Sequence, residues 1–195
     1  GSCSTIIFEY YKEAGVPFGR RVATALLMGI MMDTAFMTRA VREVDMNAFS
    51  ELFFLADWQS GSRLLKNSLS LSDLTVYREA FERAEISGEF CFIPLSRASS
   101  PELSALIADF FLTFREVRFV VILVPDRDGH RIQVRSENND LPADSVIRMA
   151  MQGIGKGGGH VHMGGGTVPA DHYPGATEIR RRFESAITAG GGSIQ

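Results

Sequence analysis

The sequence has few cysteines, no apolar stretch long enough to cross a membrane and little net charge. Its 2 cysteines, Cys3 and Cys91, cannot build a disulfide scaffold and fit a reducing compartment. The longest apolar run, residues 22–37, is shorter than the roughly 20 residues that span a bilayer, and Asp33 interrupts it. A net charge of −3 argues against a protein that coats DNA through overall positive charge. We therefore expect a soluble, cytoplasmic protein.

What the sequence does contain is an ordinary apolar content, 45% over 195 residues, which is enough for one domain or two small ones. Up to about residue 85 the pattern predicts helices, over 6–15, 19–38, 46–58 and 74–85. Beyond it, strands and helices alternate: strands over 88–95, 117–125 and 127–137, and helices over 101–114, 142–152 and 177–187. Asp128 and Gly129 predict a hairpin turn between the last two strands. The expected fold class is α/β, with a helical piece in front of a small α/β module.

The predicted helix over 19–38 is apolar on nearly all sides and carries one carboxylate, Asp33, in its middle. Such a helix needs neighbours all around it, so either a second chain covers it or the sequence belongs to something larger, and we favour the second explanation. A carboxylate in apolar surroundings is costly unless it is paired, hydrogen-bonded or bound to a metal. Two interpretations of Asp33 stay open: a structural hydrogen bond, to Thr34 or an arginine, and a metal-binding or catalytic role.

Residues 153–166 carry the densest chemical signal, with 8 glycines in 14 positions around His160. We expect a glycine-rich loop, because glycine adopts positive φ freely and lets the backbone approach a ligand closely. Successive exposed N–H groups in such a loop form a nest for an anion, and a histidine beside it can donate a hydrogen bond to phosphate. The alternative is a flexible loop whose histidines take no part. The number of glycines favours a phosphate-binding role for Gly157, Gly158, Gly159 and His160.

Two familiar phosphate motifs do not explain these glycines. Gly153, Gly155 and Gly158 satisfy G-x-G-x-x-G, but a predicted helix precedes them instead of a strand, so a dinucleotide-binding fold is rejected. A P-loop is excluded because no Ser or Thr follows the lysine of this segment at the required spacing. His162 lies two residues after His160, so on a strand both would share one face as a metal pair. Taken alone, His162 is more readily explained as an uninvolved residue.

The basic residues are dominated by arginine, since only 3 of the 20 are lysine. That bias alone decides little, because it often reflects genome composition. Arg135 is more informative, because it lies on a predicted strand beside Ser136 and ahead of the glycine-rich segment. Its planar guanidinium suits phosphate oxygens. Arg135 is therefore a candidate for binding phosphate.

Two features in this order, residues 29–34 (GIMMDT) and later Arg135-Ser136 followed by residues 157–160 (GGGH), resemble motifs of the DHH family of phosphoesterases. That family includes RecJ-type exonucleases, nano-RNA and cyclic-dinucleotide phosphodiesterases and manganese-dependent exopolyphosphatases. The resemblance spans roughly residues 3–185. The sequence departs from the family's pattern after GGGH, where Gly164, Gly165 and Gly166 stand in place of Ala-Ala-Gly.

The resemblance implies a catalytic domain that holds two manganese ions, joined to a smaller substrate-binding domain. It assigns Asp33 to the metals, and it assigns Arg135, Ser136, Gly157, Gly158, Gly159 and His160 to the substrate. It divides the chain into the C-terminal helical part of the catalytic domain (1–70), a linker helix (71–84), the substrate-binding domain with a mixed sheet (85–190) and a flexible tail (191–195). The family's other aspartate motifs and its Asp-His-His triplet are missing from this sequence. Since one carboxylate cannot hold two manganese ions, we expect the Mn²⁺ sites to be absent or incomplete and assign no catalytic residue.

The sequence thus predicts the C-terminal, substrate-binding part of a manganese-dependent DHH-type phosphoesterase that acts on phosphodiester or phosphoanhydride bonds. The expected ligand is an oligonucleotide, a cyclic dinucleotide or polyphosphate, with little or no hydrolysis by this chain. The alternatives are a non-catalytic nucleic-acid-binding or regulatory module and an assembly piece whose apolar helices pair with a second copy. The resemblance makes a homodimer plausible. Aromatic residues such as Phe36, Trp58 and Tyr173 are candidates for stacking on a base.

Overall fold

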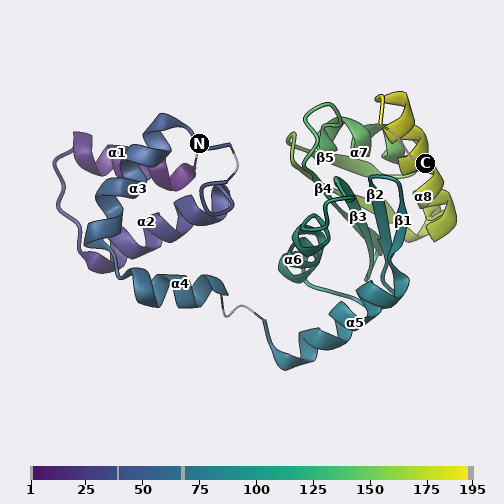
Figure 1. Cartoon of the computed structure of the whole chain (residues 1–195), viewed down its shortest axis with the longest axis horizontal. Coiled ribbons are helices and arrows are strands. Elements are labelled where there is room, and N and C mark those ends of the chain that lie inside the picture. The colour runs from purple at the N-terminus through teal and green to yellow at the C-terminus, as the bar shows by residue number, and fades with distance from the viewer. Residues whose placement is uncertain (1, 39, 67–68, 193–195) are drawn as a thin grey trace. The chain divides into compact units, whose positions relative to one another are not determined.

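The computed structural model describes residues 2–38, 40–66 and 69–192 (Figure 1). The chain divides into two compact units, Gly1–Leu69 and Ser70–Gln195. No helix in the described ranges is long and apolar enough to cross a membrane. The last three residues of the expected flexible tail lie outside the described residues.

The first unit consists of helices packed around one apolar core. Within the described residues these helices are α1 (Cys3–Glu13), α2 (Arg20–Asp33), α3 (Glu43–Leu55) and α4 (Trp58–Lys66). The largest fully buried side chains of this core are Phe8, Leu27, Ile30 and Leu52. The middle of helix α2 is buried on all sides, since Leu26, Leu27, Met28, Ile30 and Met31 are at most 9% exposed, whereas Met32 near its end is 62% exposed. The expectation that neighbours surround this helix therefore holds for its middle and not for its ends.

Helix α2 also ends earlier than predicted, at Asp33 instead of continuing to residue 38. Residues 35–37 have φ angles of 45°, 58° and 62°, in the left-handed region that non-glycine residues rarely occupy. Thr34 stabilises this turn, because its buried hydroxyl donates to the Ile30 carbonyl at 2.7 Å and accepts the N–H of Met37 at 3.1 Å. Asp33 therefore lies at an exposed helix end, and its predicted position in the apolar middle of a helix is wrong.

The second unit is a six-stranded mixed sheet with helices on both faces. Its strands are β1 (Glu85–Ser87), β2 (Phe90–Pro94), β3 (Phe119–Asp126), β4 (Gly129–Ser136), β5 (Lys156–Gly159) and β6 (Met163–Pro169). They lie in the order β1-β2-β3-β4-β6-β5, and only β2 and β3 run parallel. Its helices are α5 (Leu74–Arg83), α6 (Pro101–Phe111), α7 (Ala143–Met151) and α8 (Ala176–Ala189), with short 3₁₀ turns η1 (Leu71–Asp73) and η2 (Ala170–His172). The predicted α/β class and the mixed sheet are confirmed.

Each face of this sheet has its own apolar core. Helices α5 and α6 pack on one face, where β3 contributes Val120, Ile122 and Val124. Helices α7 and α8 pack on the other face, where β3 contributes Phe119, Val121 and Leu123. Strand β3 is a continuous apolar run because helices cover it on both faces. Helix α5, expected as a linker, belongs to the first of these cores.

The glycine-rich segment is a β-hairpin, so its prediction as a loop is wrong. Strands β5 and β6 pair through Gly157 with Gly166, Gly158 with Gly165 and Gly159 with Gly164. Glycine has low strand propensity, so β-propensity does not explain its frequency in this hairpin. The hairpin predicted at Asp128 and Gly129 is confirmed, with Asp126 paired to Gly129.

Candidate functional site

Helix α6 covers only part of its face of the sheet. It packs against β3 and β4, and the sheet continues beyond them to β6 and to β5 at the edge (Figure 1). We call the α6 side of β4, β6 and β5 the open face, because no helix among the described residues of this unit covers it beyond β4. By strand alternation and register, the residues on this side are Arg131, Gln133, Arg135, Lys156, Gly158, His160, Met163, Gly165 and Thr167.

Arg135 and His160 lie in one row across the open face. Arg135 on β4 pairs with Met163 on β6, and the His160 N–H donates to the Met163 carbonyl at 2.8 Å. The row therefore spans two strand spacings, about 10 Å between the backbones of its ends. His160 is exposed. The register places the guanidinium-bearing and imidazole-bearing residues on the same side of the sheet.

The side chain of Arg135 is held in place by helix α6. Its Nε donates to Asp109 Oδ1 at 2.9 Å, and its Nη1 donates to the Val134 carbonyl at 3.2 Å. Arg135 is 8% exposed, whereas the Asp109 side chain is about half exposed, at 47%. The carboxylate therefore fixes the guanidinium at the border between α6 and the open face. The sequence analysis missed Asp109, because its contact with Arg135 depends on how α6 packs on β4.

The glycines of the β5–β6 hairpin fall into two groups. A Cβ at Gly157 would lie 2.8 Å from Ile147 Cγ1 on α7, so the close approach of this helix requires glycine. A Cβ at Gly158 or at Gly165 would have no neighbour closer than 4.0 Å and 3.8 Å, respectively. Packing does not demand glycine at these two positions. Their effect is to leave the backbone of the open face without side chains.

The N–H groups of these glycines do not form the expected nest. Strand β5 pairs with β6 on one side, and no further strand of the described chain pairs with its outer side. In an antiparallel pair, every second residue directs its N–H and C=O away from the partner strand. Since His160 bonds to Met163, the residues that direct these groups outward are Gly157 and Gly159. The N–H groups left unpaired therefore belong to every second residue of an edge strand. In an anion-binding nest they would belong to consecutive residues of a loop.

Ser136 and His162 support a turn at the end of the hairpin. The Ser136 hydroxyl donates to the Leu141 carbonyl at 2.9 Å and accepts the Asn138 N–H at 3.2 Å, and the residue is 1% exposed. The Ser136 N–H donates to the His162 carbonyl at 3.0 Å, and His162 Nδ1 lies 3.1 Å from the Ser136 carbonyl oxygen. The Ser136 hydroxyl is thus used within the chain. The ring of His162 bonds to β4 and does not pair with His160.

The open face carries more positive charge than the sequence analysis assigned to it. Lys156 is exposed on β5, in the same strip as Arg135. Arg131 donates from Nη2 to the Ser99 carbonyl, and its Nη1 lies 3.7 Å from Asp126 Oδ2. The Nε of Arg131 is buried and has no hydrogen-bond partner among the described residues. Three cationic residues therefore lie on one strip, and two of them, Arg131 and Arg135, are paired with the carboxylates of Asp126 and Asp109.

Asp33 belongs to the first unit, where it is the exposed last residue of α2. The described residues contain no group of three or more His, Cys, Asp or Glu side chains that could hold a metal ion. Each manganese ion takes about six ligands, mostly oxygen or imidazole. The residues present therefore do not fit the two-metal centre that the family resemblance implies, and Asp33 can supply one ligand at most.

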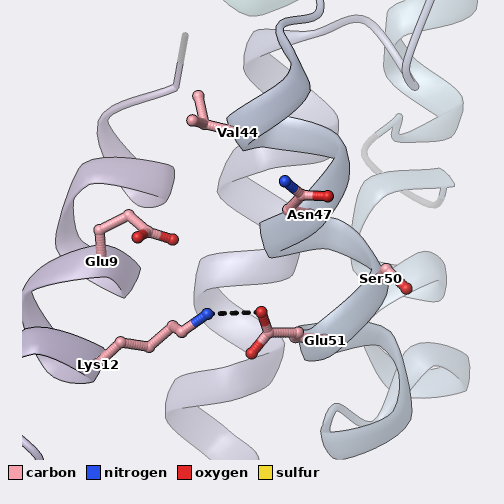
Figure 2. A pocket seen from close by; sticks show the side chains of 6 residues that line it. All are labelled: Glu9, Lys12, Val44, Asn47, Ser50 and Glu51. Carbon is pink, nitrogen blue, oxygen red and sulfur yellow. Dashed lines mark hydrogen bonds and ion pairs between the residues drawn. The ribbon is translucent and has the colours of Figure 1, made fainter.

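The first unit has a pocket of about 290 Å³ between α1 and α3 (Figure 2). It is lined by Glu9, Lys12, Val44, Asn47, Ser50 and Glu51. Lys12 Nζ donates to Glu51 Oε1 at 2.6 Å, and this hydrogen bond raises the pKa of Lys12. Because the cation in the lining is already paired and carboxylates stand on both walls, this pocket does not suit a phosphate.

Comparisons with known proteins support the fold. No family model matches the sequence. "Uncharacterized protein MJ1633" of Methanocaldococcus jannaschii is 22% identical over 193 residues, which cover 97% of this chain and 40% of that protein. The crystal structure of an exopolyphosphatase-related protein from Bacteroides fragilis matches 95% of this chain and 56% of its own, with 22% identity and a TM-score of 0.77. RecJ from Thermus thermophilus in complex with Mg²⁺ matches 87% of this chain and 25% of its own, with 15% identity and a TM-score of 0.48.

The match to the Bacteroides fragilis protein covers nearly the whole chain. The chain therefore shares the fold of this exopolyphosphatase-related protein, which agrees with the resemblance to the DHH family. It spans 40% of the length of the curated relative and 56% of the solved chain.

Proposed function

We propose that the second unit binds phosphate groups of a substrate on the open face. The chain would then be the C-terminal, substrate-binding part of a DHH-type phosphoesterase, acting on an oligonucleotide, a cyclic dinucleotide or polyphosphate. The observation that carries this proposal is the row of Arg135 and His160 on one side of the sheet, with Lys156 on the same strip. The fold shared with an exopolyphosphatase-related protein supports a role in phosphoryl chemistry.

Each group on the open face has a distinct part in this proposal. The guanidinium of Arg135, oriented by Asp109, forms charge-assisted hydrogen bonds to phosphate oxygens. His160 donates a hydrogen bond from the other end of the row. Gly158 and Gly165 let the ligand approach the backbone, because no side chain stands in the way. Binding, orientation and charge neutralisation are thus this chain's contribution to phosphoryl transfer.

Binding is tested by thermal shift and titration calorimetry with inorganic tripolyphosphate and a 5′-phosphorylated dinucleotide. Because His160 is exposed, His160→Ala should keep the melting temperature of the free protein. We expect it to weaken phosphate binding about ten-fold, the loss of one charge-assisted hydrogen bond. His172→Ala is the matched control, because His172 is an exposed histidine outside the row. Equal binding by wild type, His160→Ala and His172→Ala would refute the role of the row.

Hydrolysis is a separate question from binding. Because the described residues do not fit a two-metal centre, we expect weak or no turnover of bis-nitrophenyl phosphate by this chain in the presence of Mn²⁺. Robust turnover that Asp33→Ala abolishes would overturn this expectation.

A non-catalytic nucleic-acid-binding or regulatory module is the second candidate function. The cationic strip of Arg131, Arg135 and Lys156 favours it, since such a strip binds a phosphate backbone without any catalysis. An Asp-His-His motif encoded upstream in the same gene would decide for the phosphoesterase. Sedimentation at several protein concentrations tests the expected homodimer.

A further inference from the structure

Helices α5 and α6 of the second unit carry exposed apolar side chains on their outer side, and we call this surface the aromatic patch. Its members are Leu74 and Phe81 on α5, Leu106 and Phe110 on α6, and Phe114 just beyond α6. Each of these residues is between 37% and 62% exposed. They recur at spacings of four or seven residues, so those of each helix lie on one side of it.

Contacts between rings join the two helices into one surface. Phe81 and Phe110 meet edge-on with ring centroids 5.4 Å apart, and Phe110 and Phe114 do so at 5.7 Å. The half-buried Tyr77 contacts Phe110 across the same border, with ring centroids 6.5 Å apart. The buried residues of α5 and α6 belong to the same core. The aromatic patch is therefore a fixed surface of the second unit.

The size of the aromatic patch matches the apolar part of a dimer interface. With about 150–250 Å² for each large apolar side chain, the exposed fractions leave about 400 Å² of apolar surface in water. A stable interface takes about 800 Å² from each partner, of which about 450–520 Å² is apolar. The patch supplies most of this area, and aromatic residues are the type enriched at interface cores.

The charges beside the aromatic patch have both signs. On α5, Arg78 and Glu82 lie beside the apolar stripe, 3.7 Å apart, and their side chains are 73% and 66% exposed. After Phe114 the chain continues with Arg115 and Glu116, which are also exposed. A rim of one sign would repel its own copy, whereas a rim of both signs can face its copy across a two-fold axis with opposite charges opposed. This arrangement favours a second copy over an acidic or a basic partner.

We propose that the aromatic patch is the surface through which two copies of this chain associate. The two α5 helices pack antiparallel across a two-fold axis, so that Arg78 of one copy lies near Glu82 of the other. The sequence analysis expected a dimer contact on the apolar helices, whereas this surface belongs to the second unit. The inference does not depend on phosphate binding by the open face.

Sedimentation equilibrium of the whole chain at several protein concentrations tests the surface. Wild type should form a dimer that dissociates on dilution. Phe110→Ser combined with Phe114→Ser should raise the dissociation constant about 30-fold or more, the usual effect of losing an aromatic residue at the centre of an interface. Phe54→Ser is the matched control, because Phe54 is 82% exposed in the first unit. It should leave the dissociation constant unchanged.

Charge reversal tests the same contact without removing apolar surface. Arg78→Glu and Glu82→Arg should each weaken the dimer about three- to ten-fold, and the double variant should restore it. Both side chains are exposed, so these variants serve the comparison even if the serine variant does not fold.

Two results would overturn the inference. The first is a wild type that stays monomeric at every concentration. The second is a dimer that Phe54→Ser dissociates and that the substitutions in and beside the patch leave intact. Loss of the dimer in the serine variant without any effect of charge reversal would overturn the antiparallel arrangement of α5.

Discussion

The Nε of Arg135 lies 2.9 Å from the Oδ1 of Asp109, so strand β4 and helix α6 are joined by an ion pair at the border of the open face. The arginine side chain is 10% exposed and the aspartate side chain 47% exposed. The carboxylate orients the guanidinium, and it also offsets the positive charge that a phosphate would meet. These two effects oppose each other in ligand binding.

Substitutions of Asp109 separate orientation from charge. Asp109→Asn keeps an oxygen that accepts the hydrogen bond of Arg135 and removes the negative charge. We expect it to raise tripolyphosphate affinity about two- to five-fold at low salt, and less at high salt because ions screen the interaction. Asp109→Ala removes the acceptor and should lower the affinity. Calorimetric titrations at two salt concentrations measure both variants, and equal affinities for them would contradict an orienting role.

The two groups of glycines should differ in stability. Gly157→Ala places a Cβ 2.8 Å from Ile147 Cγ1, and we expect it to lower the free energy of unfolding by about 1–3 kcal/mol through overpacking. Gly165→Ala meets no atom closer than 3.8 Å and should be neutral or stabilising by up to about 1 kcal/mol, since alanine loses less entropy on folding. Urea unfolding of both variants gives the comparison. A larger loss for Gly165→Ala would show that the faces are assigned wrongly.

Glu79 on α5 should make stability depend on pH. Burial alone would raise its pKa, but hydrogen bonds from Ser96, Arg83 and Arg97 outweigh burial and hold the pKa below the usual 4.5. A carboxyl group with a lowered folded-state pKa stabilises the protein above its unfolded pKa, and this contribution is lost as the pH falls through the folded-state pKa. We expect Glu79→Gln to cost about 1–3 kcal/mol at pH 7. The difference from wild type should shrink below about pH 4.5.

An exposed glutamate of the same helix is the control for this measurement. Glu82 lies 3.7 Å from Arg78, and its side chain is 66% exposed. Glu82→Gln should change the free energy of unfolding by less than about 1 kcal/mol at any pH. The same pH profile for the Glu79 and Glu82 variants would refute the assignment.

Substitution of Thr34 should destabilise the protein much more than substitution of Asp33. Asp33→Asn changes an exposed helix end and should alter the free energy of unfolding by about 0.5 kcal/mol or less. Thr34→Val removes a buried hydroxyl that bonds to Ile30 and Met37, and should cost about 1–3 kcal/mol. Thermal unfolding compares the two. A strongly destabilised Asp33→Asn variant would restore the interpretation of Asp33 as a buried, paired carboxylate.

The elements that the sequence predicted well are those with local signals. The turn at Asp128 and Gly129 and the apolar strand before it are encoded within a few residues. The end of α2 was missed, because an apolar sequence does not show that Phe36 and its neighbours adopt left-handed φ angles. The hairpin of β5 and β6 was missed for a different reason. Its glycines carry no alternating pattern, and one of them, Gly157, is explained only by contact with α7.

The sequence predicted some residues of the candidate site, but it did not predict that they lie on one face of a sheet. The sequence drew attention to Arg135 and His160, and their common side follows from the order of β4, β6 and β5. Lys156 was missed, because the sequence predicted a loop there. Asp109 was missed, because it belongs to a helix that is distant from the glycines in sequence. Their roles require the strand order and the packing of α6.

The contact of Gly157 with Ile147 couples the two ends of the row to different helices. The strand before His160 is seated on α7, and Arg135 is anchored to α6 on the opposite side of the sheet. We therefore expect a smaller or larger residue at Ile147 to change the separation of the imidazole and the guanidinium, and with it the size of ligand accepted, from the opposite face of the sheet.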